Sequence, residues 1–192
     1  MLNGASCLAW VMNLIGESDA DALLACVEER YRRPSRVIFL PYLTGERTPH
    51  NNPDARGAFF GLDATTEKLD LVQAVLEGVA FSLKDAQQCL AEAGCRHSDP
   101  GFIGGGARSA LWGRIIANVL GRPIVRYEGA RFGPALGAAR LAMIAATGAT
   151  VAEVGRPPER GTTVVPDDAV ADEYRERHQT FRSLYRSAEE LF

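Results

Sequence analysis

Cysteine and histidine are scarce in this sequence of 192 residues, and neither is spaced as in a metal site. The four cysteines form no C-x-x-C pair, and the three histidines lie in separate segments. The usual zinc-binding patterns are therefore excluded. We expect reduced, mostly buried thiols in a cytoplasmic protein. The cysteines are Cys7, Cys26, Cys89 and Cys95.

Long hydrophobic runs and an excess of positive charge are also lacking. No apolar stretch approaches the roughly 20 residues of a membrane-spanning helix. The amino terminus has no basic region ahead of an apolar stretch, so it does not resemble a signal peptide. The formal net charge is −3, which gives no support for a nucleic-acid or membrane partner. With 46% hydrophobic and 23% charged residues, the chain is typical of one globular domain.

Three catalytic patterns are missing as well. The sequence contains neither the G-x-S-x-G turn of many hydrolases nor the G-x-x-x-x-G-K-[ST] loop that binds phosphates. The scattered histidines provide no pairing of a nucleophile with a base. We therefore identify no catalytic residue in this chain.

A run of three glycines is the most informative motif present. Phe102 and Ile103 end a short predicted strand, residues 104–106 are glycine, and a predicted helix runs from Ser109 to Gly121. Because glycine has no Cβ, a ligand can lie directly against this main chain. The N-terminus of the helix favours an anion, as in nucleotide sites. A nucleotide site and a simple tight turn are both compatible with this motif alone.

Alternating strand and helix patterns predict an α/β domain with a mixed sheet. Strands are expected at residues 37–40, 58–62 and 123–127. Helices are expected at residues 5–15, 19–33, 65–93, 109–120, from 133 and from 168. The long segment 41–57 between the first two strands has no periodicity and is expected to be an ordered loop.

Small residues inside two predicted helices indicate close packing. Gly78 lies in the middle of the longest helix, where glycine costs roughly 1 kcal/mol relative to alanine. We therefore expect another backbone to approach it closely. Gly137, Ala138 and Ala139 predict that the helix from Gly133 presses tightly on a neighbour.

Several segments, in order and covering nearly the whole chain, resemble the FGGY family of carbohydrate kinases. The second signature of this family is similar to two segments of the chain, GAFFGL and DLVQAVLE, which are separated by seven residues. The loop sequence PYLTGERTPH is similar to the xylulokinase branch, and the glycine turn and the GPALGAAR segment agree. These segments are residues 57–62, 70–77, 41–50, 103–109 and 133–140.

The resemblance implies the carboxyl-terminal domain of a two-domain kinase with the actin-like ATPase, ribonuclease H-like fold. This fold has a mixed sheet flanked by helices, here expected to be incomplete at its N-terminal edge. We expect a nucleotide-binding domain at residues 1–154, a linker at 155–166, and at 167–192 a helix packed on the same domain. The implied reaction is ATP-dependent phosphorylation of a ketopentose, with D-xylulose converted to D-xylulose 5-phosphate.

The resemblance also implies the residues that bind ATP. The adenosine would lie against the glycine turn, the start of the first helix would face the phosphates, and Mg²⁺ would be held through those phosphates. Two departures from related kinases are Ala110 in place of an adenine-binding Asn and Ala9 near the position of a Gln. The implied nucleotide-binding residues are Gly4, Ala5, Gly104, Gly105, Gly106, Ala107, Arg108 and Ser109.

The family's catalytic Asp, its phosphate-binding hairpin and its sugar-binding domain would lie upstream of Met1. We therefore expect the isolated chain to be inactive and the sugar to be contacted mainly by the missing N-terminal domain. One alternative is a non-catalytic nucleotide-binding module whose open sheet edge takes a partner, for example a second copy in a homodimer. Another is a Rossmann-type NAD-binding protein, with Gly104-x-Gly106-x-x-Ser109 as fingerprint and Glu128 on the ribose.

Two further points stay open at this stage. Arg108 is either an edge contact of the nucleotide or a solvent-facing residue of the helix start. Glu46, Arg47 and His50 either form a polar cluster near the cleft or pin their loop, and we favour pinning, because such side chains commonly bond to loop main chain.

Overall fold

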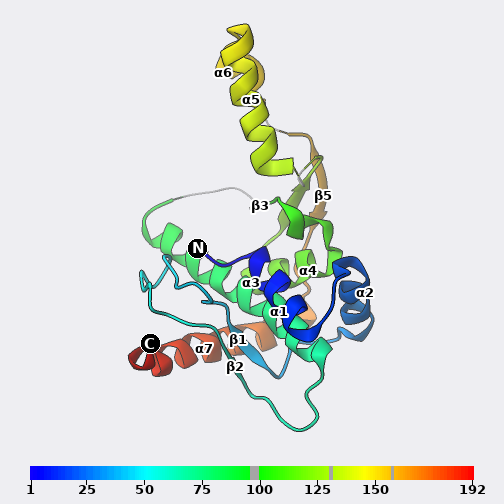
Figure 1. The fold of residues 1–192 in the computed structure, drawn as a ribbon, viewed down its shortest axis with the longest axis vertical. Coiled ribbons are helices and arrows are strands. Elements are labelled where there is room, and N and C mark those ends of the chain that lie inside the picture. The colour runs from blue at the N-terminus through cyan, green and yellow to red at the C-terminus, as the bar shows by residue number, and fades with distance from the viewer. Residues whose placement is uncertain (96–99, 130–131, 157) are drawn as a thin grey trace.

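Helices make up most of the protein in the computed structural model, which describes residues 1–95, 100–129, 132–156 and 158–192 (Figure 1). The α-helices are α1 (Ala5–Ile15), α2 (Ala20–Arg30), α3 (Lys68–Glu92), α4 (Ala110–Leu120), α5 (Gly133–Thr147), α6 (Val151–Val154) and α7 (Ala171–Ala188). The strands are β1 (Ile38–Leu40), β2 (Ala58–Phe60), β3 (Gly101–Phe102), β4 (Ile124–Tyr127) and β5 (Arg160–Val164). Short 3-10 turns lie at Gly105–Arg108, Asp168–Val170 and Glu189–Leu191.

Within the described residues, the strands form two small sheets in place of the single sheet expected. β1 and β2 are antiparallel, with Ile38 opposite Phe60. The other sheet has the order β3-β4-β5 and is mixed, because β3 and β4 are parallel whereas β4 and β5 are antiparallel. No described strand pairs with the outer edge of β3, so this edge of the sheet is open.

The segment expected to be a linker, residues 155–166, contains the strand β5. Its sequence RGTTV has no apolar alternation and its residues are exposed or half-buried, which is why periodicity did not predict it. Pairing with β4 determines its conformation, since Ile124 lies opposite Val164. Here the tertiary context overrides the local sequence signal.

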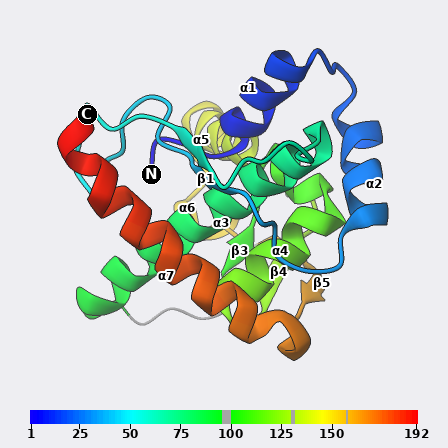
Figure 2. The same cartoon turned by 90° about the horizontal axis from the view of Figure 1, so that it is seen from below.

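The long helix α3 passes through the centre of the molecule (Figure 2). It begins with a capping box in which Glu67 and Asp70 bond to each other's backbone N–H groups. Thr65 and Thr66 before it do not cap it: the Thr66 hydroxyl oxygen accepts from the Asp63 N–H at 2.9 Å, and the Thr65 hydroxyl oxygen accepts from Arg36 at 3.4 Å. A Cβ at Gly78 would lie 2.3 Å from the Phe39 carbonyl oxygen. The predicted close approach of a backbone is therefore confirmed, and β1 lies directly on α3.

The C-terminal helix α7 packs across α3, α4 and β1 (Figure 2). Tyr174, Phe181 and Tyr185 are buried on its inner face. The Phe181 ring lies 5.4 Å from the ring of Phe81 on α3, centroid to centroid. This aromatic contact joins the end of the chain to the same hydrophobic core that α1, α2 and α4 share.

A buried carboxylate lies beneath this packing. Glu77 on α3 is 1% exposed and accepts hydrogen bonds from the Ser35 N–H, the Gln73 amide and the Tyr174 hydroxyl. Burial raises the pKa of Glu77 to about 7, although these hydrogen bonds act in the opposite direction. The network links α3, α7 and the segment that leads into β1.

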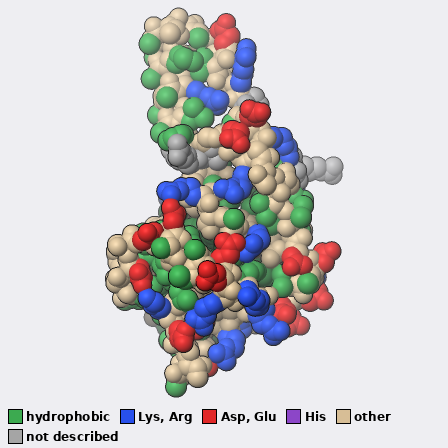
Figure 3. All heavy atoms as spheres, turned by 90° about the vertical axis from the view of Figure 1, so that its right-hand side faces the viewer, with side chains coloured by type: hydrophobic (Ala, Val, Ile, Leu, Met, Phe, Trp, Pro, Cys, Tyr) green, Lys and Arg blue, Asp and Glu red, His purple; other side chains and the backbone are tan. Residues whose placement is uncertain are grey.

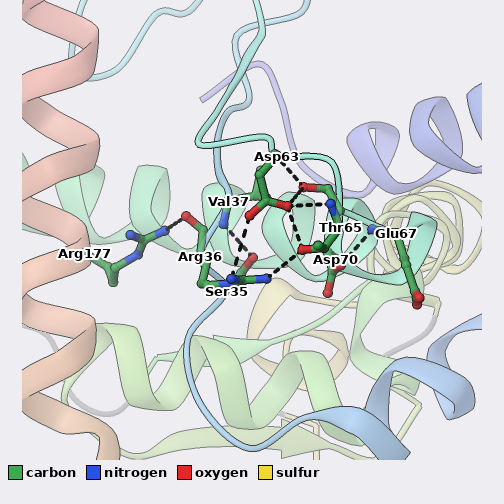
Figure 4. A network of polar contacts seen from close by, with 9 residues as sticks. Ser35, Arg36, Val37, Asp63, Thr65, Glu67, Asp70 and Arg177 are labelled. Carbon is green, nitrogen blue, oxygen red and sulfur yellow. Dashed lines mark hydrogen bonds and ion pairs between the residues drawn. The ribbon is translucent and has the colours of Figure 1, made fainter.

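A more exposed polar network holds the start of α3 near the same segment (Figure 4). The Asp63 carboxylate accepts from the Thr65 N–H at 2.8 Å and lies 3.7 Å from the Arg36 guanidinium. Arg177 of α7 donates to the Arg36 carbonyl. The turn before α3, the entry to β1 and the middle of α7 are therefore joined by polar contacts that lie mostly at the surface.

Helices α5 and α6 project away from the rest of the molecule (Figure 1). None of the described side chains of α5 is buried, and no described atom lies within 4 Å of a Cβ built on Gly137. The prediction that this helix presses tightly on a neighbour is therefore wrong for this chain. Hydrophobic side chains gather over the projecting part (Figure 3), and Leu141 and Val151 are 70% and 72% exposed.

The cysteines are free, but only Cys7 is buried, whereas Cys26 and Cys95 are exposed and Cys89 is half-buried. The expectation of mostly buried thiols is therefore wrong. Burial raises the pKa of the Cys7 thiol to about 12, which makes it unreactive near neutral pH. No helix in the described part of the chain is long and apolar enough to cross a membrane.

Candidate functional site

The glycine turn joins β3 to α4 through a short 3-10 turn that the sequence did not predict. Gly104 has a φ of +89°, a conformation that side chains rarely adopt. The turn Gly105–Arg108 follows, and α4 starts one residue later than expected, at Ala110. Ser109 is its N-cap, and its hydroxyl oxygen accepts from the Trp112 N–H at 3.1 Å.

The three glycines differ in the space around them. No described atom lies within 4 Å of a Cβ built on Gly105, so a ligand can reach this main chain. A Cβ on Gly106 would lie 3.1 Å from the Trp112 ring, which backs the turn. Gly106 is therefore needed for packing inside the protein, and the open side of the turn is at Gly104 and Gly105.

The N-terminus of α1 lies near this turn. Gly4 is its N-cap, no side chain among the described residues caps it by a hydrogen bond, and its first turn contains no acidic residue. Main-chain N–H groups at such an end lack intrahelical partners and carry a partial positive charge. Gly4 and Ala5 line the same hollow, of about 490 Å³, as the glycine turn. The structure thus brings these predicted residues close to the predicted turn. The other walls of this hollow are mainly core side chains of α3, α4 and β3.

A second hollow, of about 230 Å³, lies on the other side of the turn, between α1 and α2. It combines apolar side chains, such as Met12 and Leu24, with the main chain of the turn. Arg108 forms an ion pair with Asp21 of α2, and both side chains are largely exposed. Apolar side chains beside open main chain, with charged side chains at the rim, form a hollow that can bind a nucleoside.

The remaining predicted residues have different surroundings. Ala107 is buried behind the turn, and the Ser109 hydroxyl oxygen is already used as a helix cap. Ala110 is exposed, and Ala9 lines the second hollow. Asp21 was not predicted, because it lies 87 residues from Arg108 and its sequence context is only that of a helix start.

The loop after β1 does not form a single polar cluster. Glu46 is fully buried and accepts from main-chain N–H groups, whereas Arg47 is exposed. The His50 ring stacks on Tyr185 and bonds to the Tyr42 hydroxyl, and burial lowers its pKa. The side chains of Glu46 and His50 thus fix the loop at two separate places, as we favoured.

Comparison with known proteins supports the resemblance seen in the sequence. Residues 2–146 match the model of the C-terminal domain of the FGGY family of carbohydrate kinases. Xylulose kinase of Escherichia coli (strain K12) is 42% identical over 187 residues, which are 97% of this chain and 39% of that protein. Xylulose kinase of Klebsiella pneumoniae is 43% identical over 145 residues.

Solved structures agree. A xylulose kinase from Brucella ovis matches with a TM-score of 0.87 and 40% identity, over 100% of this chain and 40% of that one. A ligand-bound xylulose kinase from Lactobacillus acidophilus matches with a TM-score of 0.79 and 28% identity, over 97% of this chain and 38% of that one. The chain spans about two fifths of the length of these relatives.

These matches are inconsistent with the Rossmann-type alternative, because the family model includes both the glycine turn and Glu128. They agree with the expected α/β domain of actin-like ATPase type, although its sheet is split in this structure. The chain therefore belongs to the FGGY family of carbohydrate kinases, whose C-terminal domain it carries.

Proposed function

We propose that this chain is the nucleotide-binding part of an ATP-dependent kinase that converts D-xylulose to D-xylulose 5-phosphate. The observation that carries the proposal is the open main chain at Gly105 beside the uncapped N-terminus of α1. The names of the relatives support the sugar, since the E. coli and K. pneumoniae proteins are xylulose kinases.

In this proposal the adenosine lies against the glycine turn, in the hollow between α1 and α2. Gly105 gives main-chain contact, and the ion pair of Arg108 and Asp21 borders the site. The N–H groups of Gly4 and Ala5, which have no hydrogen-bond partner in the described part of the chain, face the phosphates, for which their positive partial charge is suited. ATP brings Mg²⁺ on its own phosphates, and we assign no side chain of this chain to the metal.

Phosphoryl transfer depends on positioning, on charge neutralisation and on a group that orients the attacking hydroxyl. We assign to this chain only the positioning of ATP. The catalytic base and the sugar site are assigned to the other part of a longer kinase, such as the relatives have. The chain alone is then expected to bind ADP and to phosphorylate no sugar.

Calorimetric titration with ADP, with NAD in parallel, tests the proposal. We expect saturable ADP binding, no NAD binding, and at least roughly tenfold weaker ADP binding by Gly105→Val, whose side chain would occupy open space. Gly137→Val is the matched control, because it also adds a side chain to open space, away from the site. Equal ADP affinity of a folded Gly105→Val variant would place the nucleotide elsewhere.

A second candidate is a non-catalytic module that associates with another chain. It is favoured by the open edge of β3 and by the exposed apolar side chains of α5, both of which could pair with a partner. Light scattering across a concentration series tests this candidate. A monomer at all concentrations would count against a homodimer.

A further inference from the structure

The loop after β1 is bonded to the residues that lead into α1. Glu46 in this loop is 1% exposed, and its Oε1 accepts from the Leu2 N–H at 2.7 Å and from the Arg47 N–H at 2.8 Å. The Met1 ammonium lies 3.7 Å from the same oxygen. One buried carboxylate therefore holds two chain segments that are 44 residues apart.

A second set of bonds joins the same two segments. The side-chain amide of Asn3 donates to the Gly45 carbonyl at 2.7 Å, and its oxygen accepts from the Thr44 hydroxyl at 3.3 Å. Asn3 is 3% exposed. Residues 2 and 3 immediately precede Gly4, the N-cap of α1, so these bonds fix where that helix begins.

The loop is itself held firmly, so it can position what it binds. Glu46 and Asn52 exchange backbone hydrogen bonds of 2.9 and 2.8 Å. Gly45 has a φ of +75°, and a Cβ there would lie 2.6 Å from the Pro53 carbonyl oxygen. The Asn52 side chain also donates to the Tyr185 hydroxyl of α7 at 3.3 Å. The loop thus connects the start of α1 to the core.

We propose that Glu46, with Asn3, is a positioning residue for the nucleotide: it holds the N-terminus of α1 where its free N–H groups meet phosphate. The inference rests on the proposed function. Its physical basis is that Oε2 of Glu46 is buried and has no hydrogen-bond partner among the described residues. Burying a carboxylate with one oxygen unpaired costs free energy, and the hydrogen bonds from the Leu2 and Arg47 N–H groups to Oε1 offset part of this cost, so the position of residue 2 depends on Glu46.

The test combines hydrogen exchange of residues 2–7 with ADP titration of the same 192-residue chain. Glu46→Ala removes the acceptor, and we expect exchange of these amides and the ADP dissociation constant each to rise roughly tenfold or more. Glu46→Gln keeps an oxygen acceptor and should restore both. Glu29→Ala, which removes an exposed carboxylate on α2, is the matched control and should change neither.

The outcomes separate this inference from the proposed function. If the wild-type chain binds no ADP, the proposed function fails, whereas exchange still tests whether Glu46 holds residues 2–7. If wild type binds ADP and Glu46→Ala binds it equally well, the positioning role is refuted. Equally faster exchange across the whole chain would indicate general destabilisation and would also refute it. Should Glu46→Ala not fold, Asn3→Ala breaks the second set of bonds and is judged by the same two measurements.

Discussion

The buried Glu77 makes the stability of this protein depend on pH. Its pKa is raised by burial to about 7, against an ordinary value of 4.5. Between these two pH values the folded protein binds a proton at Glu77 that the unfolded chain does not. Protonation of Glu77 therefore stabilises the folded protein. This stabilisation is fully present below pH 4.5, where both states are protonated, and it is lost as the pH rises from 4.5 through 7. Since one pKa unit corresponds to about 1.4 kcal/mol, the loss approaches about 3 kcal/mol.

Glu77→Gln isolates this effect, because glutamine resembles the protonated carboxyl and does not titrate. We expect the free energy of unfolding of the wild type to fall, relative to the variant, by roughly 2–3 kcal/mol between pH 5 and pH 8. Urea unfolding followed by tryptophan fluorescence measures it, since Trp112 is buried. Parallel curves for the two proteins would refute a protonated Glu77 in the folded state. The hydrogen bonds from Ser35, Gln73 and Tyr174 would then outweigh burial.

Three further substitutions and one control, Gly137→Ala, test packing and helix capping, each by urea unfolding. Gly78→Ala should cost roughly 1–3 kcal/mol, because its Cβ would meet the Phe39 carbonyl, whereas Gly137→Ala on exposed α5 should not destabilise. Phe181→Ala should cost roughly 3–5 kcal/mol, since the ring is fully buried, and a loss below 1 kcal/mol would contradict that burial. Asp19→Ala should cost about 1 kcal/mol, because this side chain caps α2, and an unchanged stability would argue against the cap.

Local chemistry made many element boundaries predictable. Gly16 and Gly121 end α1 and α4 in the left-handed conformation, as glycine after a helix indicates. The helix expected from residue 19 is α2, whose N-cap is Asp19, and Gly78 lies against the backbone of Phe39 as expected. At each of these positions the local sequence shows why one residue type is favoured: glycine for a left-handed conformation or a close contact, and aspartate for a helix cap.

Elements that depend on distant partners were not predictable in this way. β5 has a polar sequence and exists through its pairing with β4. The helix expected from residue 65 begins later, at Lys68, for a local reason: the Thr66 hydroxyl oxygen accepts from the Asp63 N–H, and Glu67 is the N-cap of α3. Pairing between strands decides the first outcome, and competition among neighbouring polar groups decides the second.

The candidate site divides in the same way. The glycine turn was visible in the sequence, and the family resemblance predicted that Gly4 and Ala5 lie near it. In the structure these residues and the turn line the same hollow. That Gly105, rather than Gly106, is the open position depends on where the Trp112 ring lies. The pairing of Arg108 with Asp21 depends on how α2 packs, which no local pattern encodes.

The projecting helix α5 has a thermodynamic consequence. It has 15 residues and packs mainly against the short α6, so little tertiary contact supports it. Isolated helices of about this length are marginal in water, and they melt through a gradual helix–coil equilibrium. On heating, helical circular dichroism should therefore decline before the core unfolds. The calorimetric transition will report the cooperative core, and no single free energy describes the chain with α5 included.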